Sequence, residues 1–208
     1  MLIVKWAPIV ETAWEPSFDP VLADHIGVYR NQKVRRASLS AWELLYQALA
    51  ENGLEAGEVA FENGGKPHFV GNPVYFSIAH SRGVCAAAVS DQPVGVDVER
   101  IRDSYSQRLV ERSLTDAEKA AYDGDFTRIW CRKESVAKMT GRGIVSYPAG
   151  IETTRYEFWE EKITYGGESY WLTTCCGQAI GPDGQADCSA VQLIGGASRP
   201  AGGISEEG

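Results

Sequence analysis

The sequence predicts an α+β protein in which one pattern of elements occurs twice. Strands, a helix and further strands follow one another once before residue 94 and once after it. A helical stripe of apolar residues in the first part and an alternating strand at residues 94–99 support this assignment. We therefore expect two α+β halves at residues 1–93 and 94–194, followed by a flexible tail at 195–208. The two halves share no obvious sequence.

The elements of the first half follow from apolar runs and turn residues. We expect a strand at residues 2–10, a loop up to about residue 24, and a helix from Ser38 to Glu51. The apolar residues of this helix recur at steps of three, three, one and three, and Asn52-Gly53 ends it. They are Leu39, Trp42, Leu45, Tyr46 and Leu49. Shorter strands are expected at 59–61, 74–78 and 84–89, with turns at 63–67 and 79–83.

The second half begins with the alternating strand at 94–99. A helix capped by Thr115 or Asp116 is expected to follow, and a second helix should run from a cap at Asp125 through Thr140. Gly141 then stops the second helix. Further strands are expected near 155–165, 169–176 and 189–194.

The composition excludes several classes of protein. The chain has 208 residues, with 20 basic and 28 acidic side chains, and its net charge of −8 argues against general nucleic-acid binding. No run of about 18 apolar residues indicates a membrane span, and the N-terminal apolar run is too short for a signal peptide. Five cysteines without a paired framework indicate reduced thiols, so we expect a cytoplasmic protein. Cys175 and Cys176 lack the usual spacing of metal ligands.

An acidic motif lies on the strand at 94–99. Because strand side chains alternate between faces, the three valines point one way, and Asp97 and Glu99 point the other, about 7 Å apart. Gly95 lies on the acidic face, where we expect it to leave room for a ligand. Taken alone, the motif fits equally an ordinary amphipathic strand with a solvated acidic face.

A third carboxylate lies on the helix that Asp125 caps. Glu134 is an i, i+4 neighbour of Lys138 and lies at the border of a largely apolar stripe. Three converging carboxylates need a cation, for which Mg²⁺ with a phosphate substrate is the usual solution. The alternative is a surface Glu–Lys pair. The stripe consists of Phe126, Ile129, Trp130, Lys133 and Ala137.

Several segments are candidates for binding phosphate. Gly65-Lys66-Pro67 is a glycine turn with one lysine, although the spacing of a Walker loop is absent. His80-Ser81 follows an apolar strand, and both side chains can donate hydrogen bonds to phosphate. Basic residues concentrate at 30–36 and 128–142, where they could form the local positive patches that an acidic protein needs to bind an anion.

In this order, the motifs resemble those of the 4′-phosphopantetheinyl transferases. The resemblance spans roughly residues 30–145 and is most specific in the two acidic motifs. Ser77 and Ala79 depart from it, because asparagine and serine are frequent at these positions in the family. The matching residues are Arg36-Ala37-Ser38-Leu39, Gly65-Lys66-Pro67, Phe76 to Ser81, Gly95-Val96-Asp97-Val98-Glu99, Leu114-Thr115 with Glu118, Trp130 with Lys133-Glu134-Ser135 and Lys138, and Gly141 with Gly143-Ile144.

The resemblance implies a fold and a reaction. The length is similar to that of the surfactin-synthetase-activating type, a monomer whose two similar α+β halves form a pseudo-dimer with the site between them. Such an enzyme transfers the phosphopantetheine arm of coenzyme A to a serine of an apo carrier protein and releases 3′,5′-ADP. The carrier would serve fatty-acid, polyketide or peptide synthesis, and neither a nucleic acid nor a membrane takes part.

The resemblance also implies roles for individual residues. Asp97, Glu99 and Glu134 would hold Mg²⁺, while Glu134 and Lys138 would act in catalysis. The residues implied in binding coenzyme A are Arg36, Gly65, Lys66, Pro67, His80, Ser81 and Lys138. Two alternatives stay open: a Mg²⁺-dependent phosphohydrolase or nuclease, and a catalytically silent homologue that binds a carrier protein.

Overall fold

The computed structural model describes residues 1–62, 65–142 and 148–177. Before residue 94 the elements are β1 (Leu2–Pro8), α1 (Pro20–Gly27), α2 (Gln32–Glu51), β2 (Val59–Phe61), β3 (Pro67–Phe69), β4 (Tyr75–Ser81) and β5 (Val84–Ser90). After it come β6 (Val94–Arg100), α3 (Gln107–Ser113), α4 (Asp116–Ala120), α5 (Phe126–Thr140), the short 3₁₀ helices η1 (Pro148–Gly150) and η2 (Thr153–Arg155), β7 (Phe158–Tyr165) and β8 (Glu168–Cys176).

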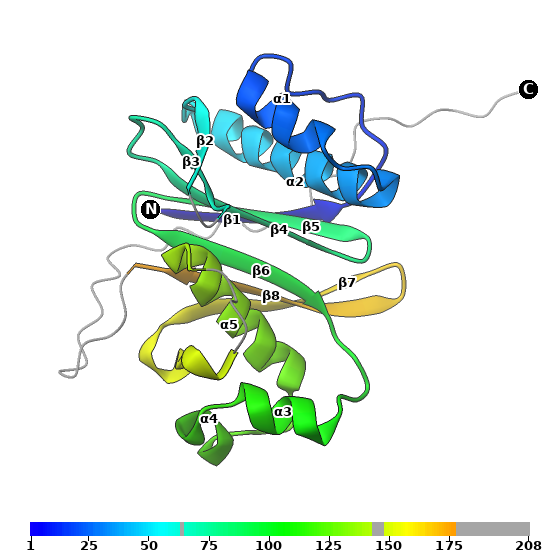
Figure 1. Ribbon diagram of the computed structural model, residues 1–208, viewed down its shortest axis with the longest axis vertical. Helices are drawn as coiled ribbons and strands as arrows, with labels where there is room; N and C mark the ends of the chain where they lie inside the picture. Colours follow the sequence, from blue (N-terminus) through cyan, green and yellow to red (C-terminus); the bar gives the residue numbers. More distant parts are fainter. Residues whose placement is uncertain (63–64, 143–147, 178–208) are drawn as a thin grey trace, which may run out of the picture.

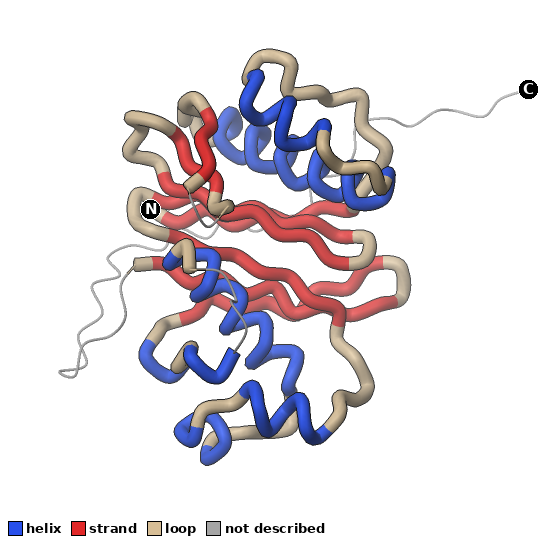
Figure 2. Tube along the Cα trace, viewed as in Figure 1, coloured by secondary structure: helices blue, strands red, loops and turns tan. Residues whose placement is uncertain are grey.

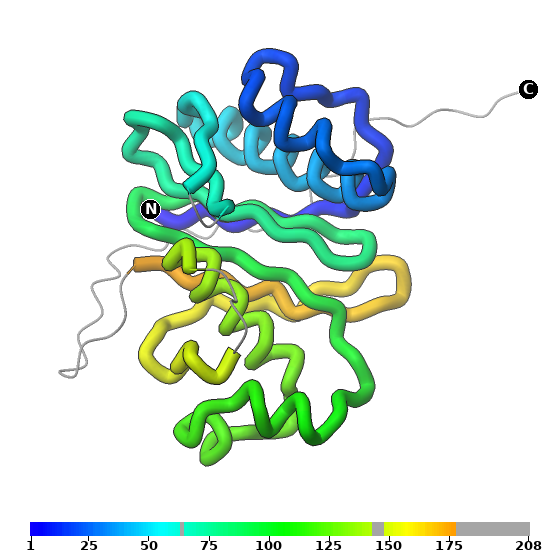
Figure 3. The backbone as a smooth tube through the Cα atoms, viewed as in Figure 1, coloured from blue at the N-terminus to red at the C-terminus, as the bar shows by residue number. Residues whose placement is uncertain are grey.

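Two three-stranded antiparallel sheets form the middle of the molecule. The strand order is β1-β5-β4 in the first and β6-β8-β7 in the second, so in each sheet the last strand along the chain lies in the centre. Figure 1 shows the first sheet above the second, and Figure 3 shows that the chain passes from the upper part to the lower part once. The mixed α+β fold predicted from the sequence is therefore confirmed.

Helices cover the outer sides of both sheets (Figure 2). One apolar cluster lies between α2 and the first sheet, and a second lies between the two sheets. The second cluster contains Val94, Val96 and Val98 of β6, which are almost fully buried. The predicted alternation of β6 is thus confirmed, and its acidic side faces the other way, toward α5.

The first half contains a helix that the sequence analysis assigned to a loop. Asp19 caps α1 by accepting a hydrogen bond from the Leu22 N–H at 3.0 Å, and Pro20 occupies its first turn, where a proline is well tolerated. The helix α2 also begins earlier than expected, because Asn31 caps it and accepts a hydrogen bond from the Lys33 N–H. Its first turns are exposed and basic, so they carry no apolar signal.

The helices of the second half largely follow their predicted caps. Thr115 and Glu118 form a capping box for α4, which ends at Ala120, and Asp125 caps α5. Gly141 ends α5 with a φ of 70°, a left-handed conformation that favours glycine. The helix α3 was not predicted, while the strand expected at 189–194 and the tail at 195–208 lie outside the described residues. Among the helices described, none is long and apolar enough to cross a membrane.

Candidate functional site

The strands β4 and β6 are edge strands of different sheets, and side chains link them directly. The Val96 N–H donates a hydrogen bond to Ser77 Oγ at 3.0 Å, and Ser81 Oγ donates to Glu99 Oε2 at 3.2 Å. The strand that carries His80-Ser81 therefore runs beside the strand that carries the acidic motif. We call this line of contact between β4 and β6 the seam.

Gly95 allows the helix α5 to lie directly on β6. A Cβ atom at this position would lie 1.9 Å from the Ser135 carbonyl oxygen and 2.5 Å from the Met139 nitrogen. The expectation that Gly95 leaves room for a ligand is therefore wrong, because the backbone of α5 fills that space. The close approach has a second effect, since it brings Glu134 and Lys138 of α5 toward the acidic face of β6.

The three predicted carboxylates influence one another. Asp97 is only 5% exposed, and Glu99 and Glu134 are half-buried. Burial, together with the charges of Asp97 and Glu99 and against the opposing effect of Lys138, raises the pKa of Glu134 to about 7. Burial and the charge of Asp97 likewise raise the pKa of Glu99. The charge of Asp97 thus adds to the effect of burial at both Glu134 and Glu99.

Lys138 brings a positive charge into direct contact with Asp97. Its Nζ donates to Asp97 Oδ1 at 2.7 Å. Burial works to lower the pKa of Lys138, but the charges of Asp97 and Glu134 outweigh it, so that the pKa is raised. The pKa of His80 is lowered by desolvation and by the charge of Lys138, which places the ring within the field of the same ammonium group.

The carboxylates have the chemistry of a Mg²⁺ site without forming one in advance. Within residues 1–62, 65–142 and 148–177, no three His, Cys, Asp or Glu side chains are gathered closely enough to hold a metal ion. However, Asp97 Oδ2 is buried and has no hydrogen-bond partner there. A buried carboxylate oxygen without a donor, beside two further carboxylates with raised pKa values, fits a hard cation that prefers oxygen ligands.

A pocket of about 220 Å³ opens at one end of the seam. It is lined by residues 65–67, by residues 76–78 of β4, and by Ala137, Lys138 and Gly141 of α5. Lys66 lies across it, and its Nζ donates to the Met139 carbonyl oxygen at 2.8 Å, at the C-terminal end of α5. Burial lowers the pKa of Lys66. The glycine turn is therefore brought to the helix α5, although the two are more than 70 residues apart in sequence.

Arg36 lies at a different end of the site. It forms an ion pair with Glu11 at 3.1 Å, and Ile9, two residues earlier, donates a backbone hydrogen bond to Gly83 at 2.8 Å. Gly83 belongs to the turn that follows Ser81. Arg36 is thus associated with the Ser81 end of β4, whereas Lys66 is associated with the C-terminal end of α5. The predicted coenzyme A contacts therefore come from several elements rather than from one point.

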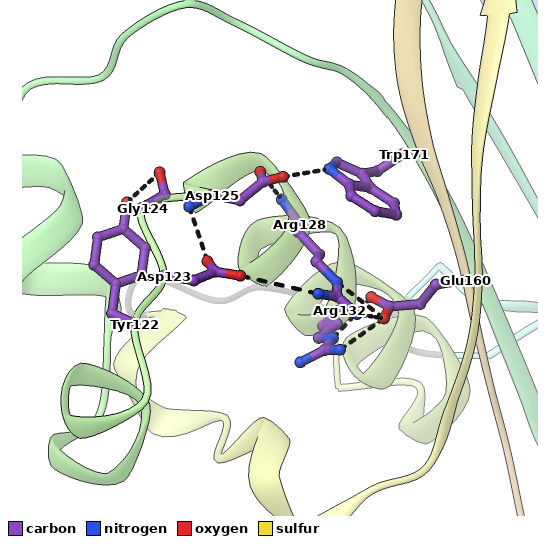
Figure 4. A network of polar contacts seen from close by, with 8 residues as sticks. All are labelled: Tyr122, Asp123, Gly124, Asp125, Arg128, Arg132, Glu160 and Trp171. Atoms are coloured by element: carbon purple, nitrogen blue, oxygen red, sulfur yellow. Dashed lines mark hydrogen bonds and ion pairs between the residues drawn. The ribbon is translucent and has the colours of Figure 1, made fainter.

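Most of the basic residues that seemed available to an anion are paired within the protein. Arg128 and Arg132 both bind Glu160, each with an N–O distance of 2.6 Å (Figure 4). Lys133 is fully buried and forms an ion pair with Glu118 at 2.6 Å. The expectation that the run at 128–142 forms a positive patch is therefore too simple, because these charges hold α5 in place.

Two features of the site escaped the sequence analysis. Ser77 of β4 lines the pocket and accepts the Val96 N–H, although the sequence analysis noted it only as a departure from the family. Arg102, just after β6, lowers the pKa of Glu99 against the effects of burial and of Asp97, and it lies over the ring of Tyr105. No spacing rule pointed to Arg102.

Comparison with known proteins agrees with this geometry. The profile of the 4′-phosphopantetheinyl transferase superfamily matches residues 93–175, which contain the three carboxylates and Lys138. The 4′-phosphopantetheinyl transferase AcpT of Salmonella typhi is 35% identical over 132 residues, which cover 58% of this chain and 67% of that protein. The 4′-phosphopantetheinyl transferase psf-1 of Bacillus pumilus is 31% identical over 102 residues, 45% of this chain and 43% of its own length. A 4′-phosphopantetheinyl transferase of Bacillus subtilis is 26% identical over 126 residues, 56% of each chain. The chain belongs to the 4′-phosphopantetheinyl transferase superfamily.

Proposed function

We propose that the protein transfers the 4′-phosphopantetheine arm of coenzyme A to a serine of an apo acyl or peptidyl carrier protein. The observation that carries the proposal is the contact of Lys138 with Asp97, within the field of Glu134 and Glu99, at a pocket that Lys138 and Lys66 line. Relatives that bear the name 4′-phosphopantetheinyl transferase support the reaction class. The serine oxygen forms a bond to the β-phosphorus, the bond from that phosphorus to the bridging oxygen breaks, and 3′,5′-ADP leaves.

The serine must lose a proton in this step, and Glu134 is the group that we assign to take it. Without a cation its pKa is about 7. Bound Mg²⁺ would lower this pKa, so Glu134 would accept the proton as a weak base, directly or through water. Lys138 remains protonated because its pKa is raised, so its ammonium group can offset the negative charge of the pyrophosphate.

Asp97, Glu99 and Glu134 are the residues that would hold Mg²⁺. When bound, the cation would neutralise the pyrophosphate and stabilise the charge that develops on the leaving oxygen. Asp97 contributes the unpartnered oxygen Oδ2, while Ser81 orients Glu99 by donating to it. In this assignment, the ammonium group of Lys138 lies against the opposite oxygen of Asp97.

The remaining contacts of coenzyme A divide between the two ends of the seam. Gly65, Lys66 and Pro67 belong to the pocket, where we place the nucleotide. His80 and Ser81 lie further along β4, and Arg36 is associated with the turn after Ser81. Arginine suits a terminal phosphate because its planar group can donate two hydrogen bonds at once.

We further propose that residues 1–93 and 94–194 are equivalent halves of a pseudo-dimer, and that the enzyme acts as a cytoplasmic monomer. In support, each sheet places its first strand beside its last, the last strand is central, and one long helix covers each outer face (Figure 2). The site would then lie where the two halves meet. Light scattering at the concentration used for the assay tests the monomer, and a dimer would overturn it.

Mass spectrometry of an apo carrier protein tests the reaction. The carrier, incubated with the protein, coenzyme A and Mg²⁺, should gain the mass of one phosphopantetheine arm, and Glu134→Gln should abolish the gain. Glu55→Gln is a matched control, because Glu55 is exposed and remote in sequence from the site motifs. A phosphohydrolase would instead cleave a phosphoester without the acceptor, and a silent homologue would leave the carrier unmodified. Either result would overturn the proposal.

A further inference from the structure

A buried hydroxyl group lies in the wall of the pocket. Ser77 is 5% exposed and is among the residues that line the cavity of about 220 Å³. Its Oγ accepts the Val96 N–H at 3.0 Å, which occupies a lone pair and leaves the hydroxyl hydrogen to be donated. In the part of the chain that the structure describes, no acceptor receives that hydrogen. The Oγ is therefore satisfied as an acceptor, and its hydrogen is available to a ligand in the pocket.

The other groups around the pocket indicate what that partner is. Phe76, Ile78 and Pro67 provide apolar walls, and Lys66 and Lys138 bring two ammonium groups. Each ammonium group has three donors, of which one is used on a protein oxygen, so both can also bind an anion. Apolar walls between two cations suit a nucleoside that bears phosphate at both its 3′ and its 5′ position, as the nucleoside of coenzyme A does.

We infer that Ser77 donates a hydrogen bond to a ring nitrogen of the adenine of coenzyme A, and so helps to select this nucleotide. The inference rests on the proposed function and adds a specificity-determining residue to it. Adenine offers ring nitrogens that accept hydrogen bonds but carry no charge, and the neutral hydroxyl is matched to them. The two lysines are left to the phosphates.

The hydrogen bond to Val96 makes Ser77 suitable for this role. It comes from the backbone of the neighbouring sheet, so it fixes the position of Oγ and limits the directions that the hydroxyl hydrogen can take. Val96 also directly precedes Asp97. The donor is therefore tied to the same strand as the carboxylates, and a nucleotide placed by Ser77 would lie in a defined position relative to them.

Titration calorimetry on the full chain tests the inference. The ligands are coenzyme A and 3′,5′-ADP, which shares its nucleotide. Ser77→Ala should weaken the binding of both ligands by a similar factor, about 2-fold to 10-fold for one hydrogen bond. Ser77→Thr, which keeps the hydroxyl, should retain most of the affinity.

Ser90→Ala is the matched control for a lost buried hydroxyl. Ser90 Oγ also accepts a backbone N–H, from Gln92 at 3.1 Å, and donates to the Met1 carbonyl at 2.9 Å, but it does not line the pocket. Its variant should bind both ligands with wild-type affinity. A thermal melt of each variant shows whether the fold is retained.

Deaza analogues of 3′,5′-ADP separate the contact from a general effect on the pocket. Each analogue lacks one ring nitrogen of adenine. The analogue that lacks the contacted nitrogen should bind the wild type with the reduced affinity that 3′,5′-ADP has for Ser77→Ala. The same analogue should bind Ser77→Ala and the wild type equally well. The inference is overturned if Ser77→Ala binds both ligands normally, weakens coenzyme A alone, or resembles Ser90→Ala. Binding without transfer would refute the proposed function but not the role of Ser77, whereas a wild type that binds neither ligand would refute both.

Discussion

The buried ion pair between Lys133 and Glu118 gives a stability prediction that can be worked from the structure. The two side chains are 0% and 1% exposed, and Lys133 Nζ lies 2.6 Å from Glu118 Oε2. Glu118 also accepts hydrogen bonds from the Thr115 N–H at 2.9 Å, and from the Thr153 N–H and hydroxyl at 3.1 and 2.6 Å. The carboxylate therefore has four donors, and Lys133 has one further acceptor in the Ile151 carbonyl.

Glu118→Leu should be strongly destabilising. Breaking a buried ion pair costs about 3–5 kcal/mol, because the remaining charge stays buried without its partner. In addition, the variant leaves the buried Thr153 N–H without its acceptor, which costs about 1–3 kcal/mol. Lys133→Met should cost less than Glu118→Leu, because Glu118 keeps its other three donors. The double variant removes both charges and should therefore be more stable than Glu118→Leu alone.

Urea unfolding followed by tryptophan fluorescence measures these differences. Lys119→Met is the control, since Lys119 forms an exposed pair with Asp116 on α4 and should leave the midpoint unchanged. A loss below about 1 kcal/mol in Glu118→Leu would refute the reasoning, since values of this size belong to exposed ion pairs. So would a double variant that is no more stable than Glu118→Leu, because the cost would then not come from an unpaired buried charge.

Three further predictions concern the site. Gly95→Ala should destabilise the protein by about 1–3 kcal/mol or more and abolish transfer, since its Cβ would overlap the backbone of α5; a normal melting temperature would contradict this packing. The pKa of Glu134, raised from 4.5 to about 7, means that the folded state binds more protons than the unfolded state between these values, so stability should fall as the pH rises through this window in metal-free buffer. Glu134→Gln should flatten that fall, and an unchanged pH profile would count against the raised pKa. Chelation of divalent cations should abolish transfer and weaken coenzyme A binding, as calorimetry with and without Mg²⁺ would show; tight binding in EDTA would argue that the carboxylates need no cation.

The features that local signals determine were predictable from the sequence. The helix α5 begins after Asp125 and ends before Gly141, as its cap and its stop residue indicate. The valines of β6 were assigned to one face of the strand because a strand has a period of two, and this face packs between the sheets. In both cases the deciding interactions lie within one element or one turn of it.

The features that depend on a partner distant in sequence were not predictable in this way. Gly95 is needed because the backbone of α5 packs directly against it, and no residue near Gly95 in the sequence indicates that α5 is the element that packs there. Lys133 was placed on a largely apolar stripe, but the reason for its burial is Glu118, which belongs to a different helix. The missed helix α1 is different, because Asp19 and Pro20 form a recognisable helix start within a segment that was assigned to a loop.

The positions of the charged residues could be read from the sequence, but the ion pairs between residues distant in sequence could not. A protein with a net charge of −8 must bring positive charge to any anionic substrate, and the basic runs in the sequence seemed to provide it. In the structure, however, Arg35 and Arg36 pair with Glu15 and Glu11, and two arginines of α5 share Glu160. These pairs offset part of the charge of the runs, and Lys66 and Lys138 are the lysines that the fold places at the pocket. One of them, Lys66, was found through its turn, and the other, Lys138, through its spacing from Glu134. Sequence counting therefore located the basic residues but not the basic surface, because ion pairing across the fold decides which of the charges a substrate can reach.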